Sequence, residues 1–458
     1  MTATAINTAA QDLSGKRALV VGLGKTGLSC AHYLHRCGAE VAVTDSRSDP
    51  PGLLDLRERL PDVAVFVGGF AADAFARSDL VVLSPGVPVR EPLVQEALQR
   101  GVEVVGDIEL FARAADAPVV AITGSNGKST VTTLVGEMAR ACGWSVRVGG
   151  NLGTPALDLL AEQAPQLYVL ELSSFQLETT RSLNAIAAVV LNVSADHMDR
   201  YDSLQEYAAA KAHIFTGGGA LVVNADDPVV MGMLAGIDPK RRVLRFSLTS
   251  AEGDTYGVHT VNGRTWLCQG GSDILPVDEL RIAGLHNVAN ALAALALGDA
   301  AGLEREATLQ TLRSFPGLPH RSQWVADIDG VAWYDDSKGT NVGATLAALQ
   351  GIPGDKVVLI AGGLGKGADF TPLRAPLLQR GRALVLIGQD AAAIAAAVAD
   401  AVPVLTATTM EEAVAEARRL AMPGDCVLLS PACASFDMFR NYEHRGEVFC
   451  QAVRGLAQ

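Results

Sequence analysis

Along most of this chain, short apolar runs alternate with longer segments in which apolar residues recur at helical spacing. Arg17–Val21, Val41–Asp45 and Leu80–Leu83 are of the first kind, and the stretch after Gly27 through Cys37 is of the second. Strands of a parallel sheet are nearly continuous apolar runs, because helices cover both faces of the sheet. The alternation therefore predicts a parallel α/β sheet in the first hundred or so residues.

The same alternation occurs twice more. In the middle of the chain we expect strands at Val119–Thr123, Tyr168–Leu170, Val189–Asn192 and Leu221–Asn224. A more β-like, glycine-rich insert at 256–274 and a helix at 287–297 follow them. Beyond a turn-rich junction at 316–319, strands are expected at Val357–Ile360, Leu384–Ile387 and Val427–Leu429, with a helix over the alanine-rich stretch Ala391–Ala401. The pattern predicts three α/β regions, in agreement with a length of 458 residues.

Composition narrows the possible functions. A formal charge of −13 disfavours nucleic acid as a partner, because a protein that binds nucleic acid presents a basic face to its phosphates. The seven cysteines form no CxxC pair, and no base is evident for Cys433, so we expect reduced thiols and a buried Cys433. The first sixteen residues contain no apolar core of a signal peptide, and no run of about 18 apolar residues occurs. These features predict a cytoplasmic protein without a membrane span.

A glycine-rich turn follows the expected strand Val119–Thr123 and begins a helix. It contains Gly124, Gly127, Lys128 and Ser129 in the sequence GSNGKS. Such a turn binds phosphates, because free backbone N–H groups and the helix dipole face the anion. The lysine contacts the terminal phosphates, and the serine hydroxyl binds Mg²⁺. The first glycine lies closer to the second than in GxxxxGK(S/T), and an ordinary turn with a surface lysine is the alternative. We predict that the turn binds ATP.

A second glycine motif joins the first strand to its helix. It contains Gly22, Gly24 and Gly27, and Asp45 follows eighteen residues after Gly27. This spacing is typical of dinucleotide sites, in which backbone amides bind a pyrophosphate and the acid binds a ribose hydroxyl. A diphosphate on any nucleotide satisfies the same contacts, and a purely structural turn is the alternative. The motif therefore indicates an anion site and leaves the nucleotide open.

Acidic residues and a histidine follow two strands of the middle region. Glu171 ends one strand, and Asp196, His197 and Asp199 come after another. Ligands of open α/β sheets bind at the carboxyl ends of the strands, so these side chains can hold Mg²⁺ beside phosphates. Solvated loop acids and a structural histidine are the alternative. Lys211, fourteen residues after His197 on an expected helix, by itself predicts only a solvated surface charge.

The last third of the chain contains three motifs that mix small residues with hydrogen-bond donors. Asp335–Asn341, Gly362–Lys366 and Leu429–Ser435 each follow an apolar strand. Their position at strand ends predicts a binding surface, and the side chains of Lys366 and Ser435 can bind the carboxylates of a small acidic substrate. These motifs alone do not identify that substrate.

Seven motifs occur in the order GSNGKST, ELSSFQLE, DHMDRY, HNxxNALAA, GLPHR, DSKGTN and LSPACAS. With them the chain resembles the Mur ligases over residues 13–456. The resemblance implies a Rossmann-like domain for a uridine diphosphate sugar (1–106), a central P-loop-type ATPase domain with a mostly parallel sheet (107–318) and a Rossmann-like C-terminal domain (319–458). DHMDRY with LSPACAS implies a monomeric, ATP-dependent ligase that adds D-glutamate to UDP-N-acetylmuramoyl-L-alanine through an acyl phosphate.

The resemblance also implies which residues meet each substrate. The uridine diphosphate substrate would contact Lys25, Thr26, Asp45, Ser46, Arg47, Gly86, Asn151 and Gln176. ATP would contact Gly124, Ser125, Asn126, Gly127, Lys128, Ser129, Thr130, Asn290, Arg321, Asp336 and Lys338. Glutamate would contact Thr340, Lys366, Ser435, Phe436 and Tyr442. Two Mg²⁺ ions would be held by Ser129, Glu171, His197 and Lys211. Lys211 would be carbamylated by CO₂, and the catalytic residues would be Lys128, Glu171, His197 and Lys211.

Some positions depart from the commoner pattern of the family. Phe436 and Tyr442 stand where Leu and Phe are more frequent, and Ser46 stands where Thr is frequent. One residue is missing between His197 and Lys211 relative to the usual spacing. The three substitutions fall in the expected glutamate and uridine diphosphate pockets.

Two other kinds of function remain open from the residues alone. An NAD-dependent dehydrogenase would account for the Gly22–Gly27 motif and Asp45, but it would leave GSNGKST and DSKGTN without a role. A non-catalytic nucleotide-binding switch would account for the phosphate loop, but it would need no amino-acid pocket.

Overall fold

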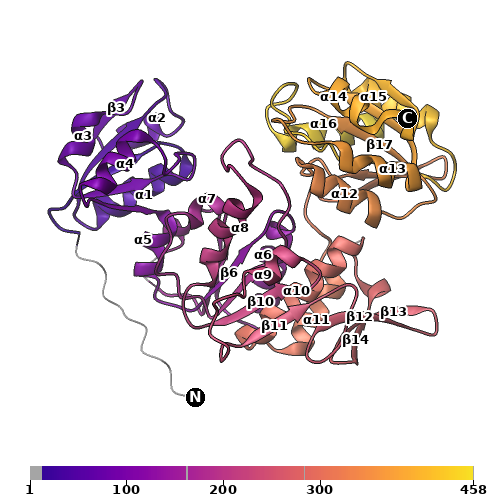
Figure 1. Ribbon diagram of the computed structural model, residues 1–458, viewed down its shortest axis with the longest axis horizontal. Coiled ribbons are helices and arrows are strands. Elements are labelled where there is room, and N and C mark those ends of the chain that lie inside the picture. The colour runs from indigo at the N-terminus through magenta and orange to yellow at the C-terminus, as the bar shows by residue number, and fades with distance from the viewer. Residues whose placement is uncertain (1–12, 161–162, 283, 457–458) are drawn as a thin grey trace.

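The computed structural model describes residues 13–160, 163–282 and 284–456, which form three α/β bodies with one sheet each (Figure 1). The first and third bodies stand on opposite sides of the central one in this view. Strands of the three sheets fall within 17–106, 119–276 and 323–429. The boundaries after residues 106 and 318 stay predictions, and residues 1–12, where no signal peptide is expected, lie outside the described chain.

The first sheet is fully parallel, in the order β3-β2-β1-β4-β5. Its strands are β1 (Arg17–Val21), β2 (Glu40–Asp45), β3 (Ala64–Val67), β4 (Leu80–Leu83) and β5 (Glu103–Gly106). Its helices are α1 (Lys25–Arg36), α2 (Leu53–Arg59), α3 (Ala72–Arg77) and α4 (Pro92–Gln99). The order reverses between β1 and β4, which opens a crevice at their carboxyl ends. β3 escaped the sequence-based prediction, because this short edge strand is largely exposed and has no buried face.

The central sheet has nine strands in the order β14-β13-β12-β11-β10-β9-β6-β8-β7, parallel from β7 to β12 and antiparallel beyond. The strands are β6 (Val119–Thr123), β7 (Val146–Gly150), β8 (Leu167–Glu171), β9 (Ala187–Val190), β10 (Ala220–Asn224), β11 (Val243–Phe246), β12 (Tyr256–Val261), β13 (Arg264–Gln269) and β14 (Ser272–Pro276). The β-like insert is thus confirmed as the antiparallel end of this sheet.

Helices cover both faces of the central sheet. On one face, α6 (Lys128–Ala141), α10 (Leu285–Ala301) and α11 (Arg305–Ser314) enclose an apolar core. The core of the other face continues into the first body without interruption, from Val20 and Leu34 to Tyr168 and Tyr207. The elements on that side are α5 (Asp107–Ala114), α7 (Ser174–Leu177), α8 (Leu204–Ala212) and the short α9 (Pro228–Gly232). The first body is therefore joined to the central one by apolar packing.

The third sheet has the order β15-β16-β20-β17-β18-β19, with only β15 antiparallel to its neighbour. Its strands are β15 (Gln323–Ile328), β16 (Val331–Asp335), β17 (Val357–Gly362), β18 (Gly381–Ile387), β19 (Val404–Thr406) and β20 (Cys426–Leu429). Its helices are α12 (Val342–Gly351), α13 (Arg374–Arg380), α14 (Ala391–Val398), α15 (Met410–Leu420) and α16 (Tyr442–Gly455). The helix expected through residue 401 ends at Val398, because Ala399 turns to φ +45° and a single 3₁₀ turn follows.

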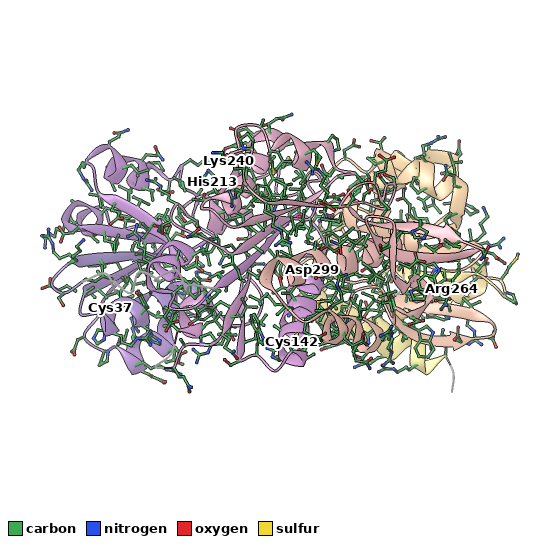
Figure 2. The ribbon with its side chains drawn as sticks, turned by 90° about the horizontal axis from the view of Figure 1, so that it is seen from below. Cys37, Cys142, His213, Lys240, Arg264 and Asp299 are labelled. Carbon is green, nitrogen blue, oxygen red and sulfur yellow. The ribbon has the colours of Figure 1, made fainter. Side chains whose placement is uncertain are left out.

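Two further expectations concern the cysteines and the membrane. All seven cysteines are free, and Figure 2 shows Cys37 and Cys142 on different bodies. Cys433 is fully buried, and burial raises its pKa to about 12, which confirms the expected inert thiol. Within the described ranges, none of the helices has the length and apolar character needed to cross a membrane.

Candidate active site

The glycine loop lies between β6 and α6, as predicted. Gly127 caps α6 with a left-handed φ of +85°, a conformation that glycine adopts without steric cost. Asn192, just beyond β9, braces the loop: its Oδ1 accepts the Asn126 N–H at 2.8 Å, and its Nδ2 donates to the Asn126 carbonyl at 3.1 Å. β9 itself ends at Val190, two residues before the predicted end. Lys128 folds back on the loop and donates to the carbonyls of Gly124 and Ser125 at 2.8 and 2.9 Å.

Lys211 lies beneath the same loop. Its ammonium group donates to the Gly124 carbonyl at 2.9 Å and sits 4.4 Å from the centre of the Tyr207 ring. Only 1% of the residue is exposed, so the expectation of a surface lysine, made from its position alone, is wrong. Burial, reinforced by the charge of Lys128, lowers the Lys211 pKa well below its usual value. The site therefore disfavours the charged form of the Lys211 amine.

Glu171, at the end of β8, faces the loop with one oxygen unused. Its Oε1 accepts from Asn151 Nδ2 at 2.6 Å, whereas Oε2 is buried and has no hydrogen-bond partner among the described residues. A buried, unpaired carboxylate oxygen is costly, and a cation would remove that cost. The Glu171 side chain therefore fits the Mg²⁺ that the sequence predicts near it.

His197 lies across the same cavity, with a left-handed φ of +57° and Nε2 3.8 Å from Asp196 Oδ2. Burial lowers its pKa, which favours the neutral imidazole that binds metals. The described part of the chain nevertheless holds no preformed group of three His, Cys, Asp or Glu side chains around one point.

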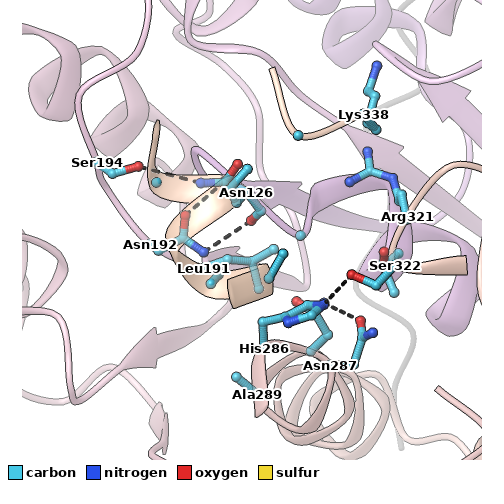
Figure 3. A pocket seen from close by; sticks show the side chains of 18 of the residues that line it. Asn126, Leu191, Asn192, Ser194, His286, Asn287, Ala289, Arg321, Ser322 and Lys338 are labelled. Carbon is cyan, nitrogen blue, oxygen red and sulfur yellow. Dashed lines mark hydrogen bonds between the residues drawn. The ribbon is translucent and has the colours of Figure 1, made fainter. Parts of the chain in front are cut away.

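Two cavities meet at the phosphate loop. One, of 650 Å³, runs between the central and third bodies and is lined by Lys128, Glu171, His197, Thr340 and Lys366 among others. The other, of 330 Å³, lies between the loop, the start of α10 and the third body. Figure 3 shows Asn126, Asn192 and Ser194 on one side of it, Arg321, Ser322 and Lys338 on another, and His286 and Asn287 below. The predicted ATP residues Asn290 and Asp336 also line this second cavity.

Charged groups in the smaller cavity are strongly perturbed. Asp336 accepts from the Ser322 N–H and the Ser430 hydroxyl at 3.0 and 2.7 Å, yet burial raises its pKa to about 7. Burial and the nearby Arg321 lower the pKa of Lys338 to about 8. Shifted pKa values of this kind are typical of ligand sites, where buried ionisable groups bind a charged ligand.

Contacts between the central and third bodies were not predicted. Arg321 donates to the Ser129 hydroxyl at 2.8 Å, and Asn341 Nδ2 donates to Asp196 Oδ2 at 3.0 Å and to Asn126 Oδ1 at 3.3 Å. The position of Asn341 before α12 is typical of a helix cap, and its Oδ1 does accept the Ala344 N–H. Its bonds to residues far away in the sequence have no local signal.

The third cavity, of 520 Å³, lies at the crevice of the first sheet and reaches the loop after β7. All eight residues predicted for the uridine diphosphate substrate line it: Lys25, Thr26, Asp45, Ser46, Arg47, Gly86, Asn151 and Gln176. The carboxylate of Asp45 already has hydrogen-bond partners within the protein. Its carboxylate accepts from the Leu23 N–H at 2.7 Å and binds Arg47 through both oxygens, and these contacts outweigh burial and lower its pKa to about 2. In this structure Asp45 therefore shapes the glycine turn.

The residues predicted for glutamate are only partly assembled. Thr340 and Lys366 line the 650 Å³ cavity, whereas Ser435, Phe436 and Tyr442 do not. Ser435 is buried, the Phe436 residue is 68% exposed, and the Tyr442 ring lies 3.7 Å from the Lys338 ammonium. The neighbour of Ser435 nevertheless lies close to the Gly362–Lys366 loop, because Ala434 and Leu364 exchange backbone hydrogen bonds of 2.9 Å.

Comparisons with known families match the three bodies one by one. Residues 16–106 match the Mur ligase MurD-like N-terminal domain, residues 122–298 the Mur ligase middle domain, and residues 320–433 the Mur ligase glutamate ligase domain.

Individual proteins and structures agree with these matches. Two proteins named UDP-N-acetylmuramoylalanine–D-glutamate ligase are similar to this chain over nearly their whole length. The protein from Nitrosococcus oceani is 55% identical, and the match covers 98% of this chain and 99% of that protein. The protein from Methylobacillus flagellatus is 56% identical, and the match covers 97% of this chain and 98% of that protein. A crystal structure of MurF from Acinetobacter baumannii matches 98% of this chain and 92% of its own chain, at 17% identity and a TM-score of 0.62. A crystal structure of MurC from Thermotoga maritima matches 96% of this chain and 100% of its own chain, at 19% identity and a TM-score of 0.59. These distant structures show the shared fold. The chain belongs to the Mur ligase family.

Proposed function

We propose that this protein is an ATP-dependent ligase that joins D-glutamate to the alanyl carboxylate of UDP-N-acetylmuramoyl-L-alanine, a step of peptidoglycan precursor synthesis. The relatives that bear this name match nearly the whole chain at 53–56% identity. The observation that carries the proposal is the position of Asn151, which lines both the 520 Å³ cavity and the 650 Å³ cavity and binds Glu171. A substrate held by the first body can thus extend its carboxylate to the phosphate loop.

The chemistry requires activation, because a carboxylate does not condense with an amine in neutral water. The alanyl carboxylate attacks the γ-phosphorus of ATP, which releases ADP and leaves an acyl phosphate. The glutamate amine then attacks the acyl carbon, and the tetrahedral intermediate expels phosphate and loses a proton. Both partners of the first step are anionic, so charge neutralisation dominates its barrier. Lys128, Arg321 and the N–H groups of the loop supply positive potential there.

The residues that would hold magnesium are Glu171, His197, Ser129 and Lys211. The unpaired Oε2 of Glu171 supports this assignment, and two ions are proposed. Bound Mg²⁺ would offset the repulsion between the substrate carboxylate and the triphosphate. The buried amine of Lys211 supports carbamylation: its nitrogen adds to the carbon of CO₂ and releases a proton, which turns a buried amine into a carboxylate donor.

The third body completes the site in this proposal. Thr340 and Lys366 would bind glutamate from the 650 Å³ cavity. Ser435, Phe436 and Tyr442 would bind the same amino acid, and closure of the third body over the central one would exclude water from the acyl phosphate. A monomeric, cytoplasmic enzyme stays a prediction of the sequence.

ADP release, coupled to a colour reaction, tests the proposal. We expect release only when ATP, UDP-N-acetylmuramoyl-L-alanine and D-glutamate are all present, and much slower release when L-glutamate replaces D-glutamate. Phosphate release that ignores glutamate would contradict the ligase, and a nicotinamide fluorescence change on titration with NADH would favour the dehydrogenase that the first glycine motif leaves open.

A further inference from the structure

Asp107 is a buried carboxyl group at the passage from the first body to the central one. It is the first residue of α5, directly after β5, and only 1% of it is exposed. Its Oδ2 accepts from Gln176 Nε2 at 2.8 Å, whereas Oδ1 is buried without a hydrogen-bond partner among the described residues. Burial raises the Asp107 pKa to about 6. Keeping such a group buried is costly, so its side-chain hydrogen bond with Gln176 calls for an explanation.

The partner of Asp107 is an amide held from both ends. Gln176 Oε1 accepts the backbone N–H and the hydroxyl of Ser173 at 3.0 and 3.2 Å, in the capping box that begins α7. Because Oε1 must accept from the Ser173 N–H and Nε2 must donate to Asp107, the amide has a single orientation. One hydrogen of Nε2 remains, and Gln176 lines the 520 Å³ cavity.

We propose that Asp107 is a positioning residue, which orients the Gln176 amide so that its remaining N–H meets an oxygen acceptor of the uridine diphosphate substrate. The acceptor would be a carbonyl or ether oxygen near the acyl end of that substrate, because Gln176 lies on the same cavity wall as Asn151. This inference rests on the proposed function.

The competing explanation is that Asp107 only fastens α5 to the segment that contains α7. Its neighbour on the same helix, Glu109, does so plainly: its carboxylate accepts the N–H groups of Arg181 and Ser182 at 2.7 and 2.9 Å and the Ser182 hydroxyl at 2.8 Å. Glu109 is buried like Asp107 but does not line the 520 Å³ cavity. It is therefore the matched control for a purely structural role.

The test compares the full-length variants Asp107→Ala, Asp107→Asn and Glu109→Ala in the coupled ADP assay. We expect Asp107→Ala to raise the KM for UDP-N-acetylmuramoyl-L-alanine about tenfold, the effect of one lost hydrogen bond at an oriented group, with kcat and the KM for ATP unchanged. Asp107→Asn should restore the wild-type KM, because its amide oxygen accepts the same N–H. Glu109→Ala should lower the urea midpoint and leave this KM unchanged.

Three outcomes would overturn the inference: a wild-type KM in Asp107→Ala, an equal rise in Asp107→Asn, or an equal rise in Glu109→Ala. If Asp107→Ala does not fold, Asp107→Ser takes its place with the same expectation, because its hydroxyl is too short to reach Nε2. Failure of the wild-type protein to join D-glutamate would refute the proposed function. Wild-type turnover with an unchanged KM in the Asp107 variants would refute only this inference.

Discussion

Gly127 is the residue on which the shape of the phosphate loop depends most directly. Its φ of +85° costs a residue with a Cβ about 1–2 kcal/mol. The added Cβ of Gly127→Ala would overlap Oδ1 of the buried Asn290. To make room, Asn290 would have to give up the bond from its Nδ2 to Asn287 Oδ1, now 3.1 Å long, at a cost of about 1 kcal/mol. We therefore expect Gly127→Ala to lower the free energy of unfolding by about 2–3 kcal/mol.

Gly143 provides the control at the other end of α6. Its φ is +78°, and a Cβ there would meet nothing within 4 Å, so Gly143→Ala measures the backbone cost alone, about 1–2 kcal/mol. Urea unfolding followed by circular dichroism compares the two variants, and phosphate release gives the KM for ATP. We expect the KM to rise about five- to thirtyfold in Gly127→Ala, since one to two kcal/mol of lost contacts correspond to about that range, and to stay unchanged in Gly143→Ala. Equal destabilisation in both variants with an unchanged KM would refute the steric reasoning.

Three further predictions concern charged groups. Lys128→Ala should abolish ADP release while the protein stays folded by circular dichroism, and retained turnover would remove the loop from the mechanism. Lys211→Ala should be nearly inactive and partly restored by short carboxylic acids, and full activity without them would contradict the carbamate. Burial raises the Asp336 pKa from 3.8 to about 7, so the stability contributed by the protonated group is present below pH 3.8 and lost as the pH rises through 7. The urea midpoint of the nucleotide-free wild type, relative to Asp336→Asn, should therefore fall across this range, and parallel profiles would contradict the assignment.

Much of the fold was predictable from local pattern. β1, β4 and β6 have the predicted bounds, because buried parallel strands are continuous apolar runs that glycine turns delimit. The strands that were missed are not continuous apolar runs of this kind. β3 is largely exposed, and β15, the antiparallel edge of the third sheet, has no fully buried face. The bounds of other elements differ by a few residues, as at β9, which spans Ala187–Val190 instead of the predicted Val189–Asn192.

The eight residues of the 520 Å³ cavity illustrate what a motif-based resemblance can supply. They come from segments between residues 25 and 176, and all of them line one cavity. Motifs identify such residues because glycine turns and strand ends are local features whose position in a doubly wound sheet is set by topology. The glutamate residues follow the same rule only in part. Thr340 and Lys366 line the 650 Å³ cavity, whereas Phe436 is largely exposed.

The sequence by itself determined the three α/β sheets, the two glycine loops and the family. These features depend on contacts between residues close together in the chain and on the spacing at which apolar residues recur. Only the tertiary structure decided the environments of Lys211, Asp107 and Asn341. The alanine-rich α8 has no apolar stripe to show that Lys211 faces inward, onto a carbonyl 87 residues away. Asp107 and Asn341 likewise acquire their partners from segments 69 and 145 residues away in the chain, where sequence separation carries no distance information.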